Sequence, residues 1–206
     1  MAPASRLPHL WVASRLRRSG RGALVSPAVF ALVAGCASTT VTLQPLPQAP
    51  LCTPAAPALV LWASRWRADQ KDVPAREEAV ASGLRESLAR SGCFAQAELR
   101  RVRNLEPATV GAQLAQATAP ATVVMGVEVR ELGPVVKLLS SAALVEGGTE
   151  VVLRIVEFAP QAATKQRQFT AHWQSGGAGV IKGVAGLPGV MQAALRAALQ
   201  PGSSAN

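Results

Sequence analysis

The chain has 206 residues, 49% of them hydrophobic, with a formal net charge of +9 and no tyrosine. Five of its 21 basic residues precede Cys36 and none of its 12 acidic residues do, so the part from Cys36 onward carries a net charge of +4. This mild charge, without an RNA-binding aromatic motif, argues against a nucleic-acid partner. The 171 residues from Cys36 onward suffice for one domain and a linker.

The N-terminal segment has the three parts of a secretory signal peptide. Four arginines between residues 15 and 21 precede an apolar run from Ala23 to Gly35, which ends in small residues before Cys36. Thirteen residues are too few for a helix that spans about 30 Å of hydrocarbon, and Pro27 would weaken such a helix. We therefore predict export, with a transmembrane segment and a signal peptide without lipid attachment as the alternatives.

The last four residues of this segment, Val33-Ala34-Gly35-Cys36, resemble the lipobox of bacterial lipoproteins. In that family the cysteine thiol is linked to diacylglycerol, the chain is cut before the cysteine, and the new amine is usually acylated. The resemblance implies a signal peptide over residues 1–35, lipid attachment at Cys36 and a membrane as partner. Because Ala37 is not aspartate, the resemblance also implies delivery to the inner leaflet of the outer membrane, facing the periplasm.

Residues 36–57 contain five prolines, at positions 45, 47, 50, 54 and 57. Proline fixes φ and removes a backbone donor, so this segment is a poor helix and a poor central strand. It predicts an extended tether between the acylated cysteine and a domain over residues 58–200. An edge strand at Val41-Thr42-Leu43 is the alternative for its first part.

A strand–helix–strand unit is predicted from Ala58 to Val102. Residues 58–63 form a continuous apolar run, which suits a strand buried on both faces. The next element begins at Pro74, carries an apolar stripe with a four-residue repeat, and ends near Gly92, as expected of an amphipathic helix. Residues 94–103 then predict an edge strand. Its basic cluster consists of Arg100, Arg101 and Arg103. This cluster indicates either a solvated edge or a contact with an anionic lipid or glycan.

Cys52 and Cys93 lie just outside the two ends of this unit. A crossover helix runs back antiparallel to its strand, so the end of the helix returns near the start of the strand. The periplasm permits disulfides. We therefore predict a Cys52–Cys93 disulfide, with two separate buried thiols as the alternative.

The rest of the chain predicts a helix at 107–117, strands at 122–132, 149–158 and 166–173, and a C-terminal helix at 189–199. The order of these elements predicts an α/β fold with a single mixed sheet and helices packed mainly on one face. Residues 201–206 are expected to fray.

Two segments are candidates for an interaction surface. The first is the apolar run 135–145, bounded by Gly-Pro and Gly-Gly, with Val135, Val136, Leu138 and Leu139 as its contact residues. Burial in the core is the alternative for that run. The second is a glycine-rich stretch in which Gly179 and Gly183 have the spacing that lets backbones approach closely, with a flexible connection as the alternative.

Residues for catalysis or metal binding are sparse after Cys36. His172 is the single histidine there, no serine lies in a nucleophile elbow, and the cysteines do not have zinc-site spacing. The glycine-rich stretch lacks the lysine context of a phosphate loop. We expect a protein that is not an enzyme and that binds neither a cofactor nor a metal.

The domain also resembles the α/β modules of envelope accessory lipoproteins, such as curli-secretion lipoproteins and activators of penicillin-binding proteins. The resemblance rests on Leu84, Leu88, Ser91, Gly92 and Phe94, followed by the strand at 123–127. It implies a binding or assembly module with an envelope protein as partner. The alternative is an auxiliary subunit of a transport system that handles lipid or solute in the periplasm.

Overall fold

The computed structural model describes residues 38–139, 144–178 and 183–201, without the side chains of 135–139, 144–146 and 178. Within these residues the chain forms one six-stranded sheet, three α-helices and a short 3₁₀ helix at Val184–Gly186. The strands are β1 (Ser38–Gln44), β2 (Thr53–Ser64), β3 (Phe94–Arg101), β4 (Val123–Leu139), β5 (Leu144–Phe158) and β6 (Lys165–Ala178). The helices are α1 (Val73–Arg90), α2 (Pro107–Ala115) and α3 (Leu187–Leu199).

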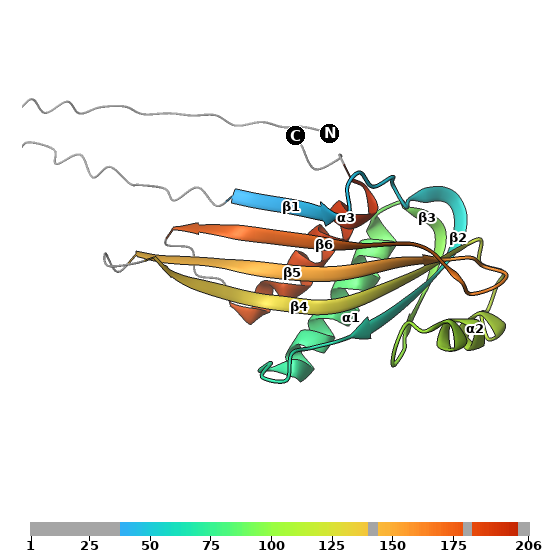
Figure 1. The fold of residues 1–206 in the computed structure, drawn as a ribbon, viewed down its shortest axis with the longest axis horizontal. Coiled ribbons are helices and arrows are strands. Elements are labelled where there is room, and N and C mark those ends of the chain that lie inside the picture. Colours follow the sequence, from blue (N-terminus) through green and yellow to red (C-terminus); the bar gives the residue numbers. More distant parts are fainter. Residues whose placement is uncertain (1–37, 140–143, 179–182, 202–206) are drawn as a thin grey trace, which may run out of the picture. The chain divides into compact units, whose positions relative to one another are not determined.

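The sheet is mixed, which confirms the predicted fold class. Its strand order is β1-β6-β5-β4-β2-β3 (Figure 1). Strand β2 pairs parallel with β3 and β4, and the other neighbours are antiparallel. Residues 59–63 of β2 are each at most 4% exposed, because β2 lies between two strands and is covered on both faces.

Helix α1 connects β2 to β3 and has the predicted signals at both ends. Pro74 lies in its first turn, and Gly92 follows its C-terminus with φ 61°, a conformation that glycine adopts readily. Val80, Leu84 and Leu88 are buried, as their spacing predicts. The helix therefore packs this stripe against the sheet.

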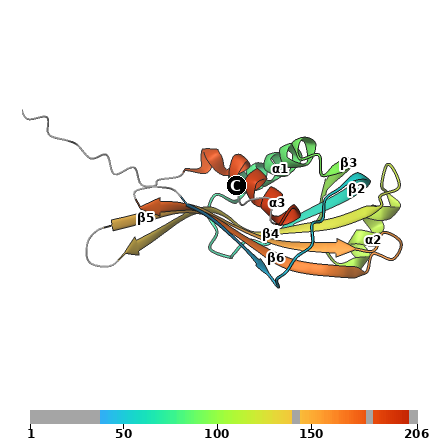
Figure 2. The same ribbon diagram turned by 90° about the horizontal axis from the view of Figure 1, so that it is seen from above.

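Helices α1 and α3 lie together on one face of the sheet (Figure 2). Gly83 of α1 allows them to approach closely, since a Cβ at this position would lie 2.7 Å from the Cβ of Met191 in α3. On the opposite face, α2 covers a second, smaller core cluster that includes Leu61, Val124 and Phe158. The helices thus lie mainly on one face, as predicted.

Strands β4 and β5 are longer than the sequence predicted. Gly133-Pro134 lies inside β4, and Gly147-Gly148 lies inside β5, so the prediction that these pairs end their elements is wrong. Strand β2 ends opposite Val129, so β4 is itself an edge from there on, where proline is tolerated. At Gly133 a Cβ would collide with the buried guanidinium of Arg76, which donates to the backbone oxygen of Leu132.

The predicted tether at 36–57 and the predicted domain start at residue 58 need correction. Residues 38–44 form β1, an edge strand that pairs antiparallel with β6, so the alternative of an edge strand at 41–43 is confirmed, and residues 53–57 belong to β2. The prolines did not prevent this because none lies within β1. Pro54 and Pro57 stand at the start of β2, where its pairing with β3 is irregular.

Candidate functional site

A groove runs along strand β3, at one edge of the sheet. It has a volume of about 500 Å³ and lies between β3 and α1. It forms where α1 covers the face of β3 only in part, with Trp62 of β2 between the helix and the edge strand. We call it the β3 groove, and its lining residues are Trp62, Pro74, Glu77, Glu78, Ala81, Arg85, Leu99 and Arg101.

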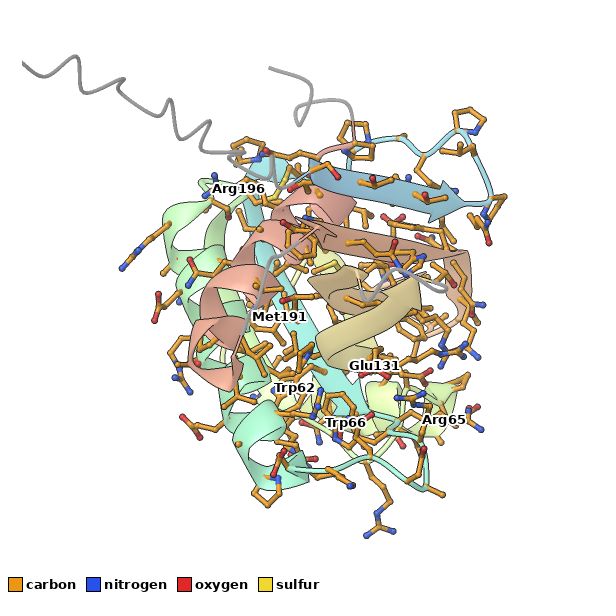
Figure 3. All side chains as sticks on the ribbon, turned by 90° about the vertical axis from the view of Figure 1, so that its left-hand side faces the viewer. Trp62, Arg65, Trp66, Glu131, Met191 and Arg196 are labelled. Atoms are coloured by element: carbon orange, nitrogen blue, oxygen red, sulfur yellow. A yellow bond between two sulfur atoms is a disulfide. The ribbon has the colours of Figure 1, made fainter. Side chains whose placement is uncertain are left out.

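The charged groups of the β3 groove hold one another in place. The guanidinium carbon of Arg101 lies 5.2 Å from the ring centroid of Trp62, a cation–π contact, and its Nη2 lies 2.6 Å from the Glu77 carboxylate. Ser64 Oγ donates to Glu77 at 2.7 Å. Trp62, labelled in Figure 3, is 4% exposed, so the floor is a fixed aromatic surface.

The pKa of Glu77 is lowered from its ordinary value. Burial raises it, but the hydrogen bond from Ser64 and the charge of Arg101 together outweigh that effect. The carboxylate is therefore ionised at neutral pH and fixes the Arg101 side chain, which is 55% exposed. The groove thus presents a positioned guanidinium beside an apolar floor.

Two smaller grooves continue along β3. One of about 260 Å³ lies on the α1 side, between Leu88 and Leu99, and one of about 220 Å³ lies on the other side, near Gln96 and Thr118. Among the described residues β3 pairs only with β2, so its outer edge has no strand partner. An unpaired edge with grooves on both sides suits the addition of an extended segment from another protein.

On the side of β3 that faces α2, the side chains are already engaged. Arg100 donates to the backbone oxygen of Gln116 at 2.6 Å and pairs with Glu98. The hydrogen bond that Arg100 donates to the Glu98 carboxylate is the main reason that the pKa of Glu98 is lowered. The predicted basic cluster at 100–103 is therefore divided, because Arg100 and Arg101 point to opposite sides of the strand.

The face of the sheet that α2 partly covers also carries charged pairs. Glu128 is 5% exposed and accepts from Arg154 at 2.5 Å and from Arg130 at 2.9 Å. Burial raises its pKa, but these hydrogen bonds outweigh burial and hold the pKa below its usual range. His172 contacts Glu150 on the neighbouring strand. These charges satisfy one another, so this face is less available to a ligand than the β3 groove.

The predicted disulfide is present. Cys52 and Cys93 are bonded, and the adjacent Thr53 amide donates to the backbone oxygen of Cys93 at 2.9 Å. The bond lies where α1 ends and β2 begins, as the crossover geometry predicts. Cys36, the predicted acylation site, lies outside the described residues, two positions before β1 begins.

The predicted interaction residues are not brought together in a described site. The backbone of Val135, Val136, Leu138 and Leu139 belongs to β4 and pairs with β5, while their side chains lie outside the description. The prediction for Gly179 also lies outside it. Gly183 is exposed, with no atom within 4 Å of a Cβ built there, so the described residues show no close packing at this glycine.

The β3 groove was missed by the sequence analysis. One signal was present, since Ala97, Leu99 and Arg101 alternate with the polar residues of β3. The contact of Arg101 with Trp62 joins residues 39 positions apart, and no local pattern predicts it.

Over the described residues there is no cluster that could hold a metal ion, and no helix has the length and apolar character to cross a membrane.

Comparisons with known proteins give no family. No family model matches the chain, and no curated protein matches it. Among solved structures, it is similar to the PelC dodecamer from Paraburkholderia phytofirmans at 12% identity and a TM-score of 0.43, over 79% of this chain and 99% of that one. It is also similar to lipoprotein GNA1162 from Neisseria meningitidis, at 12% identity and a TM-score of 0.33, over 68% of this chain and 94% of that one.

A third similar structure is described as a homolog of neuraminyllactose-binding hemagglutinin from Helicobacter pylori. It is 11% identical, with a TM-score of 0.38, over 75% of this chain and 87% of that one.

Proposed function

We propose that this chain is a lipid-anchored envelope lipoprotein, acylated at Cys36, that binds or assembles with another envelope protein and catalyses no reaction. In this proposal the protein faces the periplasm from the inner leaflet of the outer membrane. Its partner contributes an extended segment that pairs with the outer edge of β3 and places side chains in the β3 groove.

The location is supported by two independent features of the chain. The first is the sequence before Cys36, with its basic segment, short apolar run and small residues. The second is the Cys52–Cys93 disulfide, since such bonds persist in oxidising compartments and are rare in the cytosol.

The observation that carries the binding role is the outer edge of β3, which has no strand partner among the described residues and lies beside the β3 groove. Natural proteins usually protect sheet edges, because unpaired amide and carbonyl groups invite pairing with another chain. Here the edge is flanked by a groove with an aromatic floor and an Arg101 side chain held by Glu77. Main-chain hydrogen bonds would supply affinity, and the groove would select alternate side chains of the partner.

Site-specific photocrosslinking in the native envelope tests this role. A photoreactive amino acid at Leu99, in the β3 groove, should give an adduct with one envelope protein, mapped to an extended segment of that protein. The same group at Gln168, exposed on the other part of the sheet, should not. Equal adducts from both positions would contradict the proposed binding site.

A charge variant tests the specificity of this adduct. Arg101→Glu places a carboxylate beside Glu77, so it should reduce the Leu99 adduct at least tenfold. Arg103→Glu makes the same change of charge on an exposed residue just beyond β3, and it should leave the adduct unchanged. If both variants reduce the adduct equally, net charge and not the β3 groove governs association.

The anchor is tested separately by the Cys36→Ser variant. Metabolic labelling with a radioactive fatty acid should mark the wild-type protein and leave the variant unlabelled. The variant should also change its membrane fractionation. Equal labelling of both proteins would show that Cys36 is not the acylation site.

A further inference from the structure

Four strands of the sheet share one row of residues at the end where β1 begins. Ser38 of β1 pairs with Gly176 of β6, Gly176 pairs with Gly148 of β5, and Gly148 pairs with Val135 of β4. The first residue of β1 therefore lies at the same end of the sheet as the hairpin formed by β4 and β5 (Figure 1). We call the part of this hairpin beyond the row, backbone residues 136–139 and 144–147, the hairpin end.

The close pairing at this row depends on glycine. A Cβ at Gly176 would lie 2.4 Å from the backbone oxygen of Gly147 and 2.6 Å from the Cα of Gly148. Strands β5 and β6 can therefore approach here without a side chain between them. Pairing with β6 continues to Ala178 opposite Glu146, which supports the base of the hairpin end.

The short distance in sequence from Cys36 to Ser38 limits where the lipid anchor can lie. Two residues span at most about 7 Å. Strand β4 continues four residues past Val135, to Leu139, and at 3.3 Å per residue this is about 13 Å beyond the row. The hairpin end thus extends about 13 Å beyond the row, whereas Cys36 can lie at most about 7 Å from Ser38, which is in the row.

The composition of the hairpin end favours a lipid surface. It contains five large apolar residues and a single pair of opposite charges, Lys137 and Glu146, which are register partners. A two-stranded apolar ribbon is marginally stable in water on its own. Apolar residues flanked by a lysine are suited to the boundary between lipid headgroups and acyl chains. The apolar residues of the hairpin end are Val136, Leu138, Leu139, Leu144 and Val145.

We infer that the hairpin end is a second membrane contact, which enters the same leaflet that holds the acyl chains of Cys36. This inference rests on the proposed acylation. Its occupant is the bilayer and not a protein, because the anchor holds this end of the sheet within a few residues of the lipid. The sheet then contacts the membrane at two places, the acylated Cys36 and the hairpin end. The disulfide and the loop between β5 and β6 lie at the opposite end of the sheet.

Fluorescence quenching by brominated lipids tests the contact. The acylated protein is reconstituted in phosphatidylethanolamine–phosphatidylglycerol vesicles, with an environment-sensitive fluorophore on Leu138→Cys or, as control, on Gln161→Cys in the loop at the far end. We expect brominated acyl chains to lower emission at position 138 at least twofold and to leave position 161 unchanged. Equal emission changes at both positions would overturn the inference.

Two further measurements separate the possible failures. If Leu138→Cys does not fold, Lys137→Cys carries the same test, since it lies in the same strand. Acylation is checked by mass spectrometry on the same preparation. Acylated protein without quenching at the hairpin end would overturn this inference alone, whereas protein without lipid on Cys36 would overturn both it and the proposed anchor.

Discussion

Cys52 and Cys93 are joined by a disulfide, with their Cα atoms 4.6 Å apart. The bond connects the residue before β2 to the residue before β3, across a separation of 41 positions that includes the whole of α1. It therefore fixes the start of the edge strand β3 to the start of its neighbour β2. The β3 groove depends on this arrangement, since α1 and β3 form its two walls.

Removal of this disulfide should destabilise the protein strongly. In the chain-entropy model, a closed loop of about 42 residues contributes about 4 kcal/mol to the free energy of unfolding. We expect the Cys52→Ala/Cys93→Ala double variant to lose about that amount in urea unfolding monitored by circular dichroism. Reduction of the wild-type protein should have the same effect and should leave the double variant unchanged. A loss below about 1 kcal/mol would show that the bond adds little to stability.

The ion pairs of Glu128 should make stability depend on pH in a defined direction. The pKa of Glu128 in the folded protein is below its ordinary value, so ionisation stabilises the fold above the unfolded pKa of about 4.3, and this contribution is lost as pH falls through the folded pKa. Glu128→Gln should lower the free energy of unfolding by about 2 kcal/mol at pH 7. Its difference from wild type should shrink below about pH 4.

A matched control is Glu78→Gln, on an exposed position of α1. It should change stability by less than about 0.5 kcal/mol across the same pH range. Chemical denaturation of the wild type and both variants at pH 7 and pH 3 gives the stability difference of each variant from wild type at each pH. A Glu128→Gln deficit that stays constant between these two pH values would mean that packing, and not the charge of Glu128, is responsible.

Two helical glycines should respond to alanine with opposite signs. At Gly83 a new Cβ would lie 2.7 Å from both the Cβ of Met191 and the backbone oxygen of Pro188, so Gly83→Ala should destabilise the α1–α3 contact by about 2 kcal/mol. At Gly189 no atom lies within 4 Å of the new Cβ, so Gly189→Ala should stabilise α3 by about 0.5–1 kcal/mol. Thermal unfolding of both variants checks the signs, and destabilisation by both would contradict the described packing.

Local patterns predicted most of the secondary structure. The continuous apolar run of β2 and the four-residue repeat of α1 each have one interpretation that satisfies the backbone and buries the apolar residues. The disulfide followed from the direction of a crossover helix. In each case, the evidence lay within a few dozen residues, and the structure confirms these predictions.

Elements that depend on distant partners were less accessible to sequence reasoning. Strand β1 is a short, mostly polar segment, and its pairing of Val41 with Trp173 joins positions 132 residues apart. The same holds for the β3 groove, where Arg101 lies over Trp62 only after β2 and β3 have paired. The inclusion of Gly133 in β4 likewise depends on Arg76, which arrives from α1.

The most direct test of the account is the mass of the N-terminal peptide of the mature protein, purified from its native envelope and digested. We expect this peptide to begin at Cys36 and to carry the additional mass of a diacylglyceryl group on its sulfur, with a further acyl chain on its amine. Recovery of an intact N-terminus that includes residues 1–35, with no lipid on Cys36, would contradict the proposed anchor and the membrane contact inferred from it.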